Sequence, residues 1–174
     1  EDGLVGIDEQ FYCENGEFKW HRHTYHDHKK HGWLAFKDVI KYSSNIGTMK
    51  AAMRLGDARL YNYIKRFGFG NKTGIYLPGE VTGIIRRPNE WSKLSLCSIA
   101  MGQEVTVTAV QLACAVSSVA NGGYYIKPRI VDRIQDKTGA LLEKFETEKR
   151  QRVISEETSK KLRKILRGVV DEGT

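Results

Sequence analysis

Between Trp33 and Gly68 the hydrophobic residues recur every three to four positions, which is the period of α-helices that bury one face. The apolar positions are Leu34, Phe36, Val39 and Ile40, then Ile46, Met49 and Met53, then Leu60, Ile64 and Phe67. Gly56 is expected to end the second helix, Asp57 to cap the third, and Gly68 to end it. The pattern therefore predicts an all-helical block of three short helices.

Residues 68–91, GFGNKTGIYLPGEVTGIIRRPNEW, are glycine-rich and hold two of the three prolines. They predict an ordered connection rather than a helix, in which Ile75, Leu77, Ile84 and Ile85 are expected to pack. Further helices are predicted at 93–101 and at 108–120. The second of these carries apolar or small residues nearly all round, which is typical of a helix inside a core.

After Gly123 the sequence changes to two β-rich runs, YYIKPRIVDRIQ and ALLEKFE, separated by residues 136–139. Gly139 suits the positive φ of a tight turn, so these runs predict a β-hairpin. Ser155 is expected to cap a last helix. The apolar stripe of that helix consists of Leu162, Ile165, Leu166, Val169 and Val170.

Two hydroxyls and an amide, Ser43, Ser44 and Asn45, interrupt the helical pattern. Ser and Asn side chains compete for backbone hydrogen bonds, so they usually occupy caps and turns. Helix capping is therefore one interpretation of this triplet. The other is a polar cluster that handles a substrate.

The composition fits one globular domain, with 174 residues, 40% hydrophobic and 28% charged. The longest apolar runs, such as VQLACAV, are far shorter than the ~20 residues of a membrane span, and the acidic start EDGLVGIDEQ lacks the regions of a signal peptide. Neither an anchor nor an export signal is expected within these residues. The net charge of +7 permits contact with nucleic acid or acidic membranes and is also common for proteins near anionic polymers.

Three cysteines, Cys13, Cys97 and Cys114, cannot all pair within one chain. Cys97 and Cys114 lie in SLCSIAMG and QLACAV, where a small apolar side chain packs in a core. We predict that these two are buried free thiols, and we predict no disulfide.

Five histidines fall within the run HRHTYHDHKKH. They are His21, His23, His26, His28 and His31. Imidazole is a common zinc and nickel ligand, but the run contains no Cys and lacks the His-Glu-x-x-His spacing of zinc proteases. An exposed polar loop is the favoured interpretation, and a metal site is the alternative. No metal or other cofactor is assigned.

Two other features have plain structural explanations. Lys-Thr-Gly occurs at 72–74 and at 137–139, and both triplets are predicted to be turns, because the spacing GxxxxGK[ST] of a phosphate loop is absent. The last helix has a basic face that could meet phosphate, but a solvated surface explains it equally well, and no base-stacking aromatic set accompanies it. Its basic residues are Lys160, Lys161, Arg163, Lys164 and Arg167.

Three segments taken in order are quite specific: HGWLAFKDVIKYSSNIGTMKAAMRLG, YNYIKRFGFGNKTGIYLPGE and LSLCSIAMGQEVTVTAVQLACAVSSVANGGYYIKPRIV. Over roughly Gly32 to Val131 the chain resembles the transpeptidase domain of class B penicillin-binding proteins. The resemblance implies that Ser43 and Asn45 are catalytic residues of the family's Ser-x-Asn motif, with Ser44 as the variable middle residue. It also implies a fold class: mainly α with a β-hairpin, the helical part of the α+β fold of serine β-lactamases and D,D-peptidases.

The resemblance further implies a mechanism built on three motifs around one cleft. In the family, a Ser-x-x-Lys pair supplies the nucleophile and its activating amine, because a free serine hydroxyl is a weak nucleophile. The Ser-x-Asn hydroxyl relays a proton to the leaving amine, and the Asn amide orients the donor peptide. A Lys-Thr-Gly on an edge strand binds the substrate carboxylate. The reaction crosslinks D,D-peptides of peptidoglycan, and β-lactams acylate the same serine.

The 174 residues contain no Ser-x-x-Lys, and Thr158 to Lys161 offers only a Thr-x-x-Lys on the wrong side of the Ser-x-Asn. The family's nucleophile is therefore expected before Glu1, and its Lys-Thr-Gly after Thr174. Both Lys-Thr-Gly triplets in the chain are rejected as catalytic. We predict a central piece of a transpeptidase domain that is inactive on its own.

We predict that residues 1–174 are a partial penicillin-binding transpeptidase domain with four parts. These are a polar, His-rich N-terminal segment (1–31), a helical core with the Ser-x-Asn (32–121), a β-hairpin (122–150) and a terminal helix (151–174). The parent is expected to act on peptidoglycan stem peptides, bind β-lactams and be anchored at the extracytoplasmic face of the bacterial inner membrane.

Nucleic acid is not an expected partner, and a homodimer of this piece is possible. Two other functions remain as alternatives to the transpeptidase. One is a basic helical module that binds nucleic acid or another anionic partner, and the other is a His-rich metal-binding domain.

Overall fold

The computed structural model describes residues 1–173 and contains six α-helices among them. The helices are α1 (Phe36–Lys41), α2 (Asn45–Leu55), α3 (Asp57–Arg66), α4 (Ser95–Ala100), α5 (Ala109–Ala120) and α6 (Glu156–Glu172). Two short 3₁₀ turns are η1 (Glu14–Gly16) and η2 (Pro88–Glu90). The eight strands are β1 (Gln10–Tyr12), β2 (Glu17–Trp20), β3 (His23–His26), β4 (Trp33–Ala35), β5 (Tyr124–Ile126), β6 (Arg133–Gln135), β7 (Leu141–Lys144) and β8 (Lys149–Arg152).

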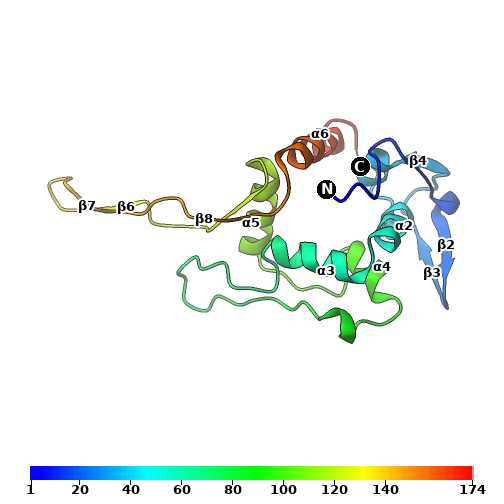
Figure 1. The fold of residues 1–174 in the computed structure, drawn as a ribbon, viewed down its shortest axis with the longest axis horizontal. Coiled ribbons are helices and arrows are strands. Elements are labelled where there is room, and N and C mark those ends of the chain that lie inside the picture. The colour runs from blue at the N-terminus through cyan, green and yellow to red at the C-terminus, as the bar shows by residue number, and fades with distance from the viewer. Residues whose placement is uncertain (174) are drawn as a thin grey trace.

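The strands form four separate antiparallel pairs: β1 with β4, β2 with β3, β5 with β8, and β6 with β7. The β2–β3 hairpin lies at one end of the molecule, and the β6–β7 hairpin projects from the other end as a narrow arm (Figure 1). The helices lie between these two ends. Both chain termini described here lie close to the middle of the molecule (Figure 1).

The first hydrophobic core joins the N-terminal strands to α1 and α2. Phe11 and Cys13 from the β1 region pack with Val39 of α1, and all three are buried. Ile46 and Met49 of α2 are fully buried as well. The close approach of α2 to α1 requires Gly47, because a Cβ there would lie 2.6 Å from both methyl groups of Val39. This core is therefore the support on which the start of α2 rests.

The second core joins α3, α5 and α6 to the base of the arm. Its buried residues are Cys114, Tyr125, Val153 and Ile154. Around them pack the partly buried residues Tyr63, Phe67, Val110, Val119 and Leu162. α6 contacts both α1 and α5, so it lies across the two cores.

Several sequence predictions are confirmed. The helices α2 to α6 lie where the apolar period places them, and Ser155 caps α6 by accepting a hydrogen bond from the Thr158 N–H. The hairpin tip turns at Gly139, which has a φ of 88°. Cys97 and Cys114 are buried free thiols, and so is Cys13.

The N-terminal part differs from its prediction. Residues 1–31 do not form only a polar segment, since they include three strands and contribute Phe11 and Cys13 to a core. Trp33 begins a strand rather than a helix, because residues 33–35 pair with residues 10–12. A pairing across more than twenty positions leaves no local periodicity, so helical spacing alone could not reveal it.

The ends and faces of two helices also need correction. Gly56, not Asp57, is the N-cap of α3, and Asp57 lies in the first turn without a capping hydrogen bond. α5 is not buried all round: Leu112 and Val116 are 52% and 58% exposed. Only the face with Gln111, which is buried, and its helical neighbours meets the second core.

The connection at 68–91 is ordered mainly by polar contacts. The buried Gln111 side chain donates to the carbonyls of Asn71 and Thr82, at 2.7 and 2.8 Å, and so ties the connection to α5. Leu77 and Ile84 were expected to pack but are exposed. Within residues 1–173, no helix combines the length and apolar character that crossing a membrane requires.

Two glycines with similar backbone angles allow a matched test of packing at the base of the arm. Gly139→Ala places a Cβ in open space at a φ of 88°, which should cost about 1–2 kcal/mol of strain. Gly123→Ala, at a φ of 101°, places its Cβ 2.0 Å from the Ile154 carbonyl oxygen. We expect it to lower the free energy of unfolding by about 1–3 kcal/mol more than Gly139→Ala, as measured by urea denaturation. Equal losses would contradict this account of the packing.

The exposed apolar face of α5 generates a prediction about assembly. Burying a few hundred Å² of such surface at ~25 cal/mol per Å² returns several kcal/mol before the entropy of association is subtracted. We expect the chain to form a dimer or a swapped assembly in sedimentation equilibrium, and Leu112→Lys with Val116→Lys to shift it toward monomer. Val170→Lys, at an apolar residue of α6 that is 86% exposed, is the control. A monomer at every concentration would refute the prediction.

Candidate active site

The triplet of residues 43–45 forms the junction between α1 and α2. The Ser43 N–H donates to the Ile40 carbonyl at 3.2 Å, and the Ser44 N–H donates to the Val39 carbonyl at 2.9 Å. These bonds close α1 and turn the chain directly into α2. The three side chains are therefore held on one short turn between two helices.

Ser44 is the N-cap of α2 and is fully buried. Its hydroxyl oxygen accepts a hydrogen bond from the Gly47 N–H at 3.0 Å, while its proton is donated to Asp27 Oδ2 at 2.6 Å. An N-cap side chain satisfies one of the backbone N–H groups that a helix start leaves without a partner. The capping interpretation therefore describes the middle residue of the triplet.

Ser43 has a different environment. It is exposed, and its φ of 52° lies in the left-handed region. A residue other than Gly, Asn or Asp adopts this conformation at a cost of about 1–2 kcal/mol, and such strain is often found at functional sites. Ser43 therefore presents its hydroxyl at the surface from a turn that the surrounding bonds must hold.

Asn45, the first residue of α2, is half-buried. Its Nδ2 donates to the His26 carbonyl at 2.9 Å. A carboxamide has two N–H donors and a carbonyl oxygen, so one bond fixes its plane while leaving further capacity to bind a ligand. The hydrogen bond to His26 thus ties the Asn45 amide to the end of β3.

Asp27 was not among the predicted site residues. Its Oδ2 accepts from Ser44 and its Oδ1 accepts from the Ile46 N–H at 3.0 Å, so its carboxylate bridges two positions at the start of α2. The one available signal in the sequence was an acidic residue inside a basic run, in HDHKK. Nothing local connects that signal to a helix that begins eighteen residues later.

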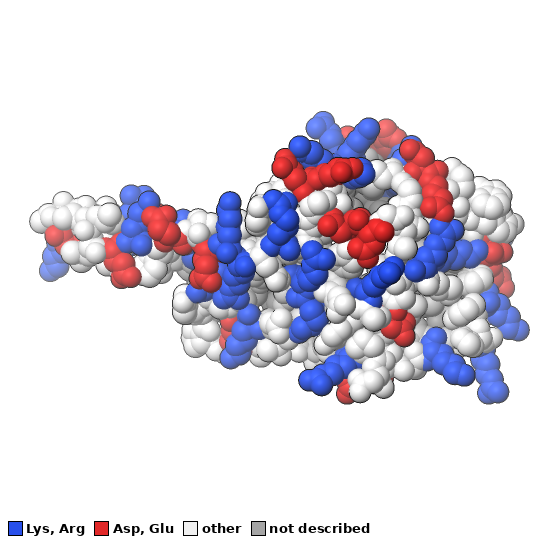
Figure 2. All heavy atoms as spheres, viewed as in Figure 1, with Lys and Arg blue, Asp and Glu red and all other residues white. Residues whose placement is uncertain are grey.

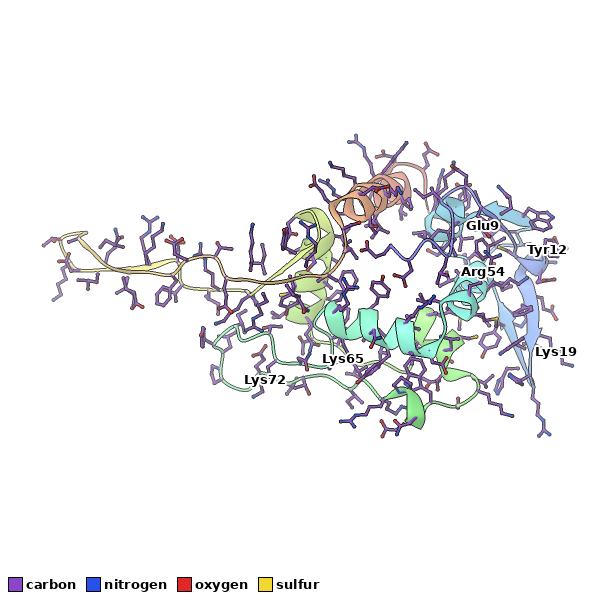
Figure 3. All side chains as sticks on the ribbon, viewed as in Figure 1. Glu9, Tyr12, Lys19, Arg54, Lys65 and Lys72 are labelled. Carbon is purple, nitrogen blue, oxygen red and sulfur yellow. The ribbon has the colours of Figure 1, made fainter. Side chains whose placement is uncertain are left out.

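Behind the triplet lies a group of residues from the β1 region. Lys50 of α2 donates to the Tyr12 carbonyl at 2.7 Å and to Glu14 Oε1 at 2.5 Å. Burial raises the pKa of the Cys13 thiol, which lies beside the triplet. Farther along α2, Arg54 forms an ion pair with Glu9 and lies over the Phe11 ring. Figure 3 shows Glu9, Tyr12 and Arg54 at the same end of the molecule. Basic residues of α2 therefore fasten it to the β1 region.

The histidine run is not the loop that was predicted. His23 and His26 lie in strand β3, which pairs with β2 through contacts such as Phe18 opposite Tyr25. The alternation of half-buried Phe18 and Trp20 with exposed neighbours signals this hairpin, although the density of histidines obscures it. The expectation of exposure holds for His21, His23, His26 and His28.

His31 differs from the other four histidines. It is half-buried and stacks on Tyr42 at a centroid distance of 5.3 Å, next to the triplet. Its Nε2 is buried without a hydrogen-bond partner among residues 1–173. Within the same residues, no three His, Cys, Asp or Glu side chains gather where they could hold a metal ion.

Of the two Lys-Thr-Gly triplets, residues 137–139 lie at a turn, as predicted, whereas residues 72–74 lie in an irregular part of the connection and not in a turn. Thr73 donates to Glu80 Oε1 through both its N–H and its hydroxyl, which holds the pKa of the Glu80 carboxyl below its usual value. Lys72 lies far across the molecule from Tyr12, so this triplet is remote from the β1 region and the start of α2 that packs on it (Figure 3). Residues 137–139 occupy the tip of the arm, where Asp136 accepts hydrogen bonds from the Thr138 and Ala140 N–H groups.

The basic face of α6 is partly neutralised within the helix. Ion pairs join Lys160 to Glu156, Lys161 to Glu157 and Arg167 to Asp171. On the face drawn in Figure 2, acidic side chains are interspersed among the basic ones over the body of the protein. This mixed pattern is typical of a solvated surface rather than of a track for nucleic acid.

An apolar groove of about 710 Å³ lies at the base of the arm, away from the triplet. It is lined by residues 75–77 and 127–131, together with Phe145, Glu146 and Glu148. The Ser-Ser-Asn turn does not line it. The prediction that Ser43 and Asn45 face a common cleft stays a prediction.

Comparison with known proteins identifies one family model and several relatives of the same kind. The family model described as penicillin binding protein transpeptidase domain matches residues 1–174. Stage V sporulation protein D of Bacillus subtilis is 41% identical over 83% of this chain and 22% of its own length. The penicillin-binding protein PbpB of Mycolicibacterium smegmatis is 34% identical over 98% of this chain and 26% of its own length. The chain thus spans about a quarter of the length of these curated relatives.

Solved structures agree with the sequence relatives. Penicillin binding protein 3 of Mycobacterium tuberculosis, in complex with aztreonam, aligns with a TM-score of 0.86 and 31% identity over 98% of this chain and 38% of that one. The D,D-transpeptidase domain of a peptidoglycan glycosyltransferase from Eggerthella lenta aligns with a TM-score of 0.90 at 21% identity, over 99% of this chain and 45% of that one. The second likeness concerns the fold alone. Together they place the chain within the fold of penicillin-binding transpeptidase domains.

The two serine N-caps allow a test of the site's local stability. Ser155→Ala removes the cap at α6 and an exposed hydrogen bond from the Ser155 hydroxyl to Glu1, and it should cost about 1 kcal/mol because solvent replaces the exposed bond. Ser44→Ala removes a cap and also leaves the Asp27 carboxylate without one of its donors, so we expect a loss of about 2–4 kcal/mol. Urea denaturation of both variants measures the difference. A smaller loss for Ser44→Ala than for Ser155→Ala would show that the bond to Asp27 does not stabilise the turn.

Proposed function

Because the chain belongs to the penicillin-binding protein transpeptidase domain family, we propose that it is the central part of a peptidoglycan D,D-transpeptidase. The proposed reaction is acyl transfer through a serine ester, which crosslinks stem peptides of the cell wall. The parent protein is the unit that carries out this reaction. The chain described here supplies one part of its active site.

In this proposal, Ser43 and Asn45 are the catalytic residues that the chain contributes. The Ser43 hydroxyl relays a proton to the leaving amine, which fits its exposure on a strained turn. The Asn45 amide orients the donor peptide, which fits a side chain fixed by one hydrogen bond and able to make more. Fixed donors of this kind lower the barrier by holding reacting groups in position.

The attacking serine of the proposed enzyme comes from sequence outside these 174 residues. Two facts support this assignment: the chain has no Ser-x-x-Lys, and it covers only 22% and 26% of two curated relatives. The same flanking sequence would supply the Lys-Thr-Gly strand. The chain is then the helical part of the α+β fold.

The proposed ligands and location follow from the relatives. The Mycobacterium tuberculosis protein has been solved with aztreonam and with ampicillin, and the Escherichia coli relative FtsI is named a peptidoglycan D,D-transpeptidase. We therefore assign β-lactams and peptidoglycan stem peptides to the parent as ligands. Its proposed place is the bacterial cell envelope, anchored at the extracytoplasmic face of the inner membrane.

The observation that carries the proposal is the Ser43-Ser44-Asn45 turn at the start of α2. Its outer residues present a hydroxyl and an amide, while its middle residue is buried as a cap. Capping needs only Ser44. The positions of Ser43 and Asn45 therefore call for a role other than capping.

Fluorescent penicillin tests the proposal. We expect the 174-residue chain to remain unlabelled in denaturing gels and mass spectra, because it lacks the attacking serine, and the longer parent protein to be labelled with one equivalent. Removing the nucleophile from a set of groups that act together removes almost all of the rate advantage. Stoichiometric labelling of the chain would show that another residue replaces the family serine.

In the parent, Ser43→Ala and Asn45→Ala should slow acylation by about 10²-fold or more, the loss typical of a misplaced or missing positioning group. Ser117→Ala, at an exposed serine of α5, is the matched control and should acylate at the wild-type rate. Wild-type rates for both site variants would remove the catalytic assignment.

A further inference from the structure

We propose that Asp27 is a positioning residue that holds Ser43 and Asn45 in their working geometry. The inference rests on the proposed function for its catalytic meaning. That the Asp27 carboxylate determines the conformation of the turn is argued from contacts within the chain alone. The hydrogen bonds of the Asp27 side chain go to Ser44 and Ile46, so Asp27 acts on Ser43 and Asn45 through their neighbours in the chain.

The carboxylate of Asp27 uses both oxygens at the same helix start. Oδ2 accepts the Ser44 hydroxyl proton at 2.6 Å, and Oδ1 accepts the Ile46 N–H at 3.0 Å. Because a hydroxyl has a single proton, donating it to Asp27 leaves the Ser44 lone pairs for the Gly47 N–H, at 3.0 Å. Asp27 thereby satisfies one N–H of α2 directly and orients the group that satisfies the next.

The charge of Asp27 suits this place. A helix N-terminus carries a partial positive charge, and a carboxylate there is stabilised by the backbone dipoles. Hydrogen bonds to an ionised acceptor are also shorter and stronger than neutral ones, as the 2.6 Å bond from Ser44 illustrates. A neutral residue of the same size would keep the shape of the contact but weaken it.

A second contact from the same segment reaches the catalytic amide. The carbonyl of His26, the residue before Asp27, accepts from Asn45 Nδ2 at 2.9 Å. Consecutive residues therefore hold the amide of Asn45 and the cap of its helix. Any shift of this segment displaces both together.

The segment itself is anchored to the first core. The Asp27 N–H donates to the Gly16 carbonyl at 3.1 Å, and the Gly16 N–H donates to the Cys13 carbonyl at 2.9 Å. Cys13 is fully buried. A series of hydrogen bonds thus connects the core to Asp27 and Asp27 to Ser44. These bonds hold the end of β3 in place.

The strained conformation of Ser43 explains why the turn needs this support. A left-handed φ at a serine persists only where neighbouring contacts over-determine it. Ser44, the residue that follows, is the one Asp27 holds. Without that bond, the turn is free to relax toward an ordinary φ, and the Ser43 hydroxyl moves away from its position.

The first arm of the test uses the 174-residue chain and does not depend on activity. In Asp27→Ala, amide hydrogen exchange at Ile46 and Gly47 should accelerate at least about 10-fold, and the NMR signal of the Asn45 side-chain amide should shift and broaden. Asp27→Asn keeps the size of the side chain and serves if Asp27→Ala does not fold. It replaces one of the two carboxylate oxygens that Ser44 and Ile46 contact with an NH2 group, which cannot accept their hydrogen bonds, so the same changes are expected at reduced size. Asp8→Asn, at an exposed carboxylate paired with Lys37, is the control. Unchanged exchange and an unchanged Asn45 signal in Asp27→Asn would overturn the proposal.

The second arm uses the parent protein and a double-mutant cycle. Asp27→Asn should lower the acylation rate constant by penicillin about 10- to 10²-fold while leaving the dissociation constant of the first complex within about 2-fold. In a Ser43→Ala, Asn45→Ala background the same change should have no further effect, because residues that act through one another are not additive. Fully additive losses would overturn the proposal. A wild-type parent that is not acylated would refute the proposed function, and the exchange measurements would still decide whether Asp27 positions the turn.

Discussion

The hydrogen bond between Asp27 and Ser44 is the contact on which the start of α2 depends. It joins the segment after β3 to a helix that begins eighteen residues farther along the chain, and it places a negative charge at the helix start. Through this bond Ser44 is committed to capping, which separates its role from those of Ser43 and Asn45. Ser43 is left exposed and Asn45 half-buried beside this buried serine.

Two hydrophobic cores hold the helices in place. The first, built on Phe11, Cys13 and Val39, fixes the junction of α1 and α2 and anchors the segment that carries Asp27. The second lies at the base of the arm and holds α5 and α6. α6 packs on α1, where Lys41 pairs with Glu172, so the turn is supported from both sides of the molecule.

The exposed apolar residues fit a chain that spans a quarter of its relatives' length. Leu112 and Val116 of α5 face solvent, although the sequence of that helix is typical of a core. A helix with apolar residues on every face gains its full stabilisation only when each face is covered. A second copy of the chain is the cover that we expect for this face in isolation.

The sequence by itself determined the helices α2 to α6, the hairpin at Gly139 and the cap at Ser155, because each rests on spacing or turn chemistry over a few residues. It also determined the family, because three segments occur in the family's order over about a hundred residues. It also singled out Ser43 and Asn45. The strand that contains His23 and His26 was missed although its partner β2 lies only three to nine positions away, because the density of histidines obscures the alternation of Phe18 and Trp20. The tertiary structure alone decided that β1 pairs with β4 and that Asp27 meets Ser44. Those contacts join residues seventeen or more positions apart, where a local pattern carries no record of the partner, and only the packing of the first core brings them together.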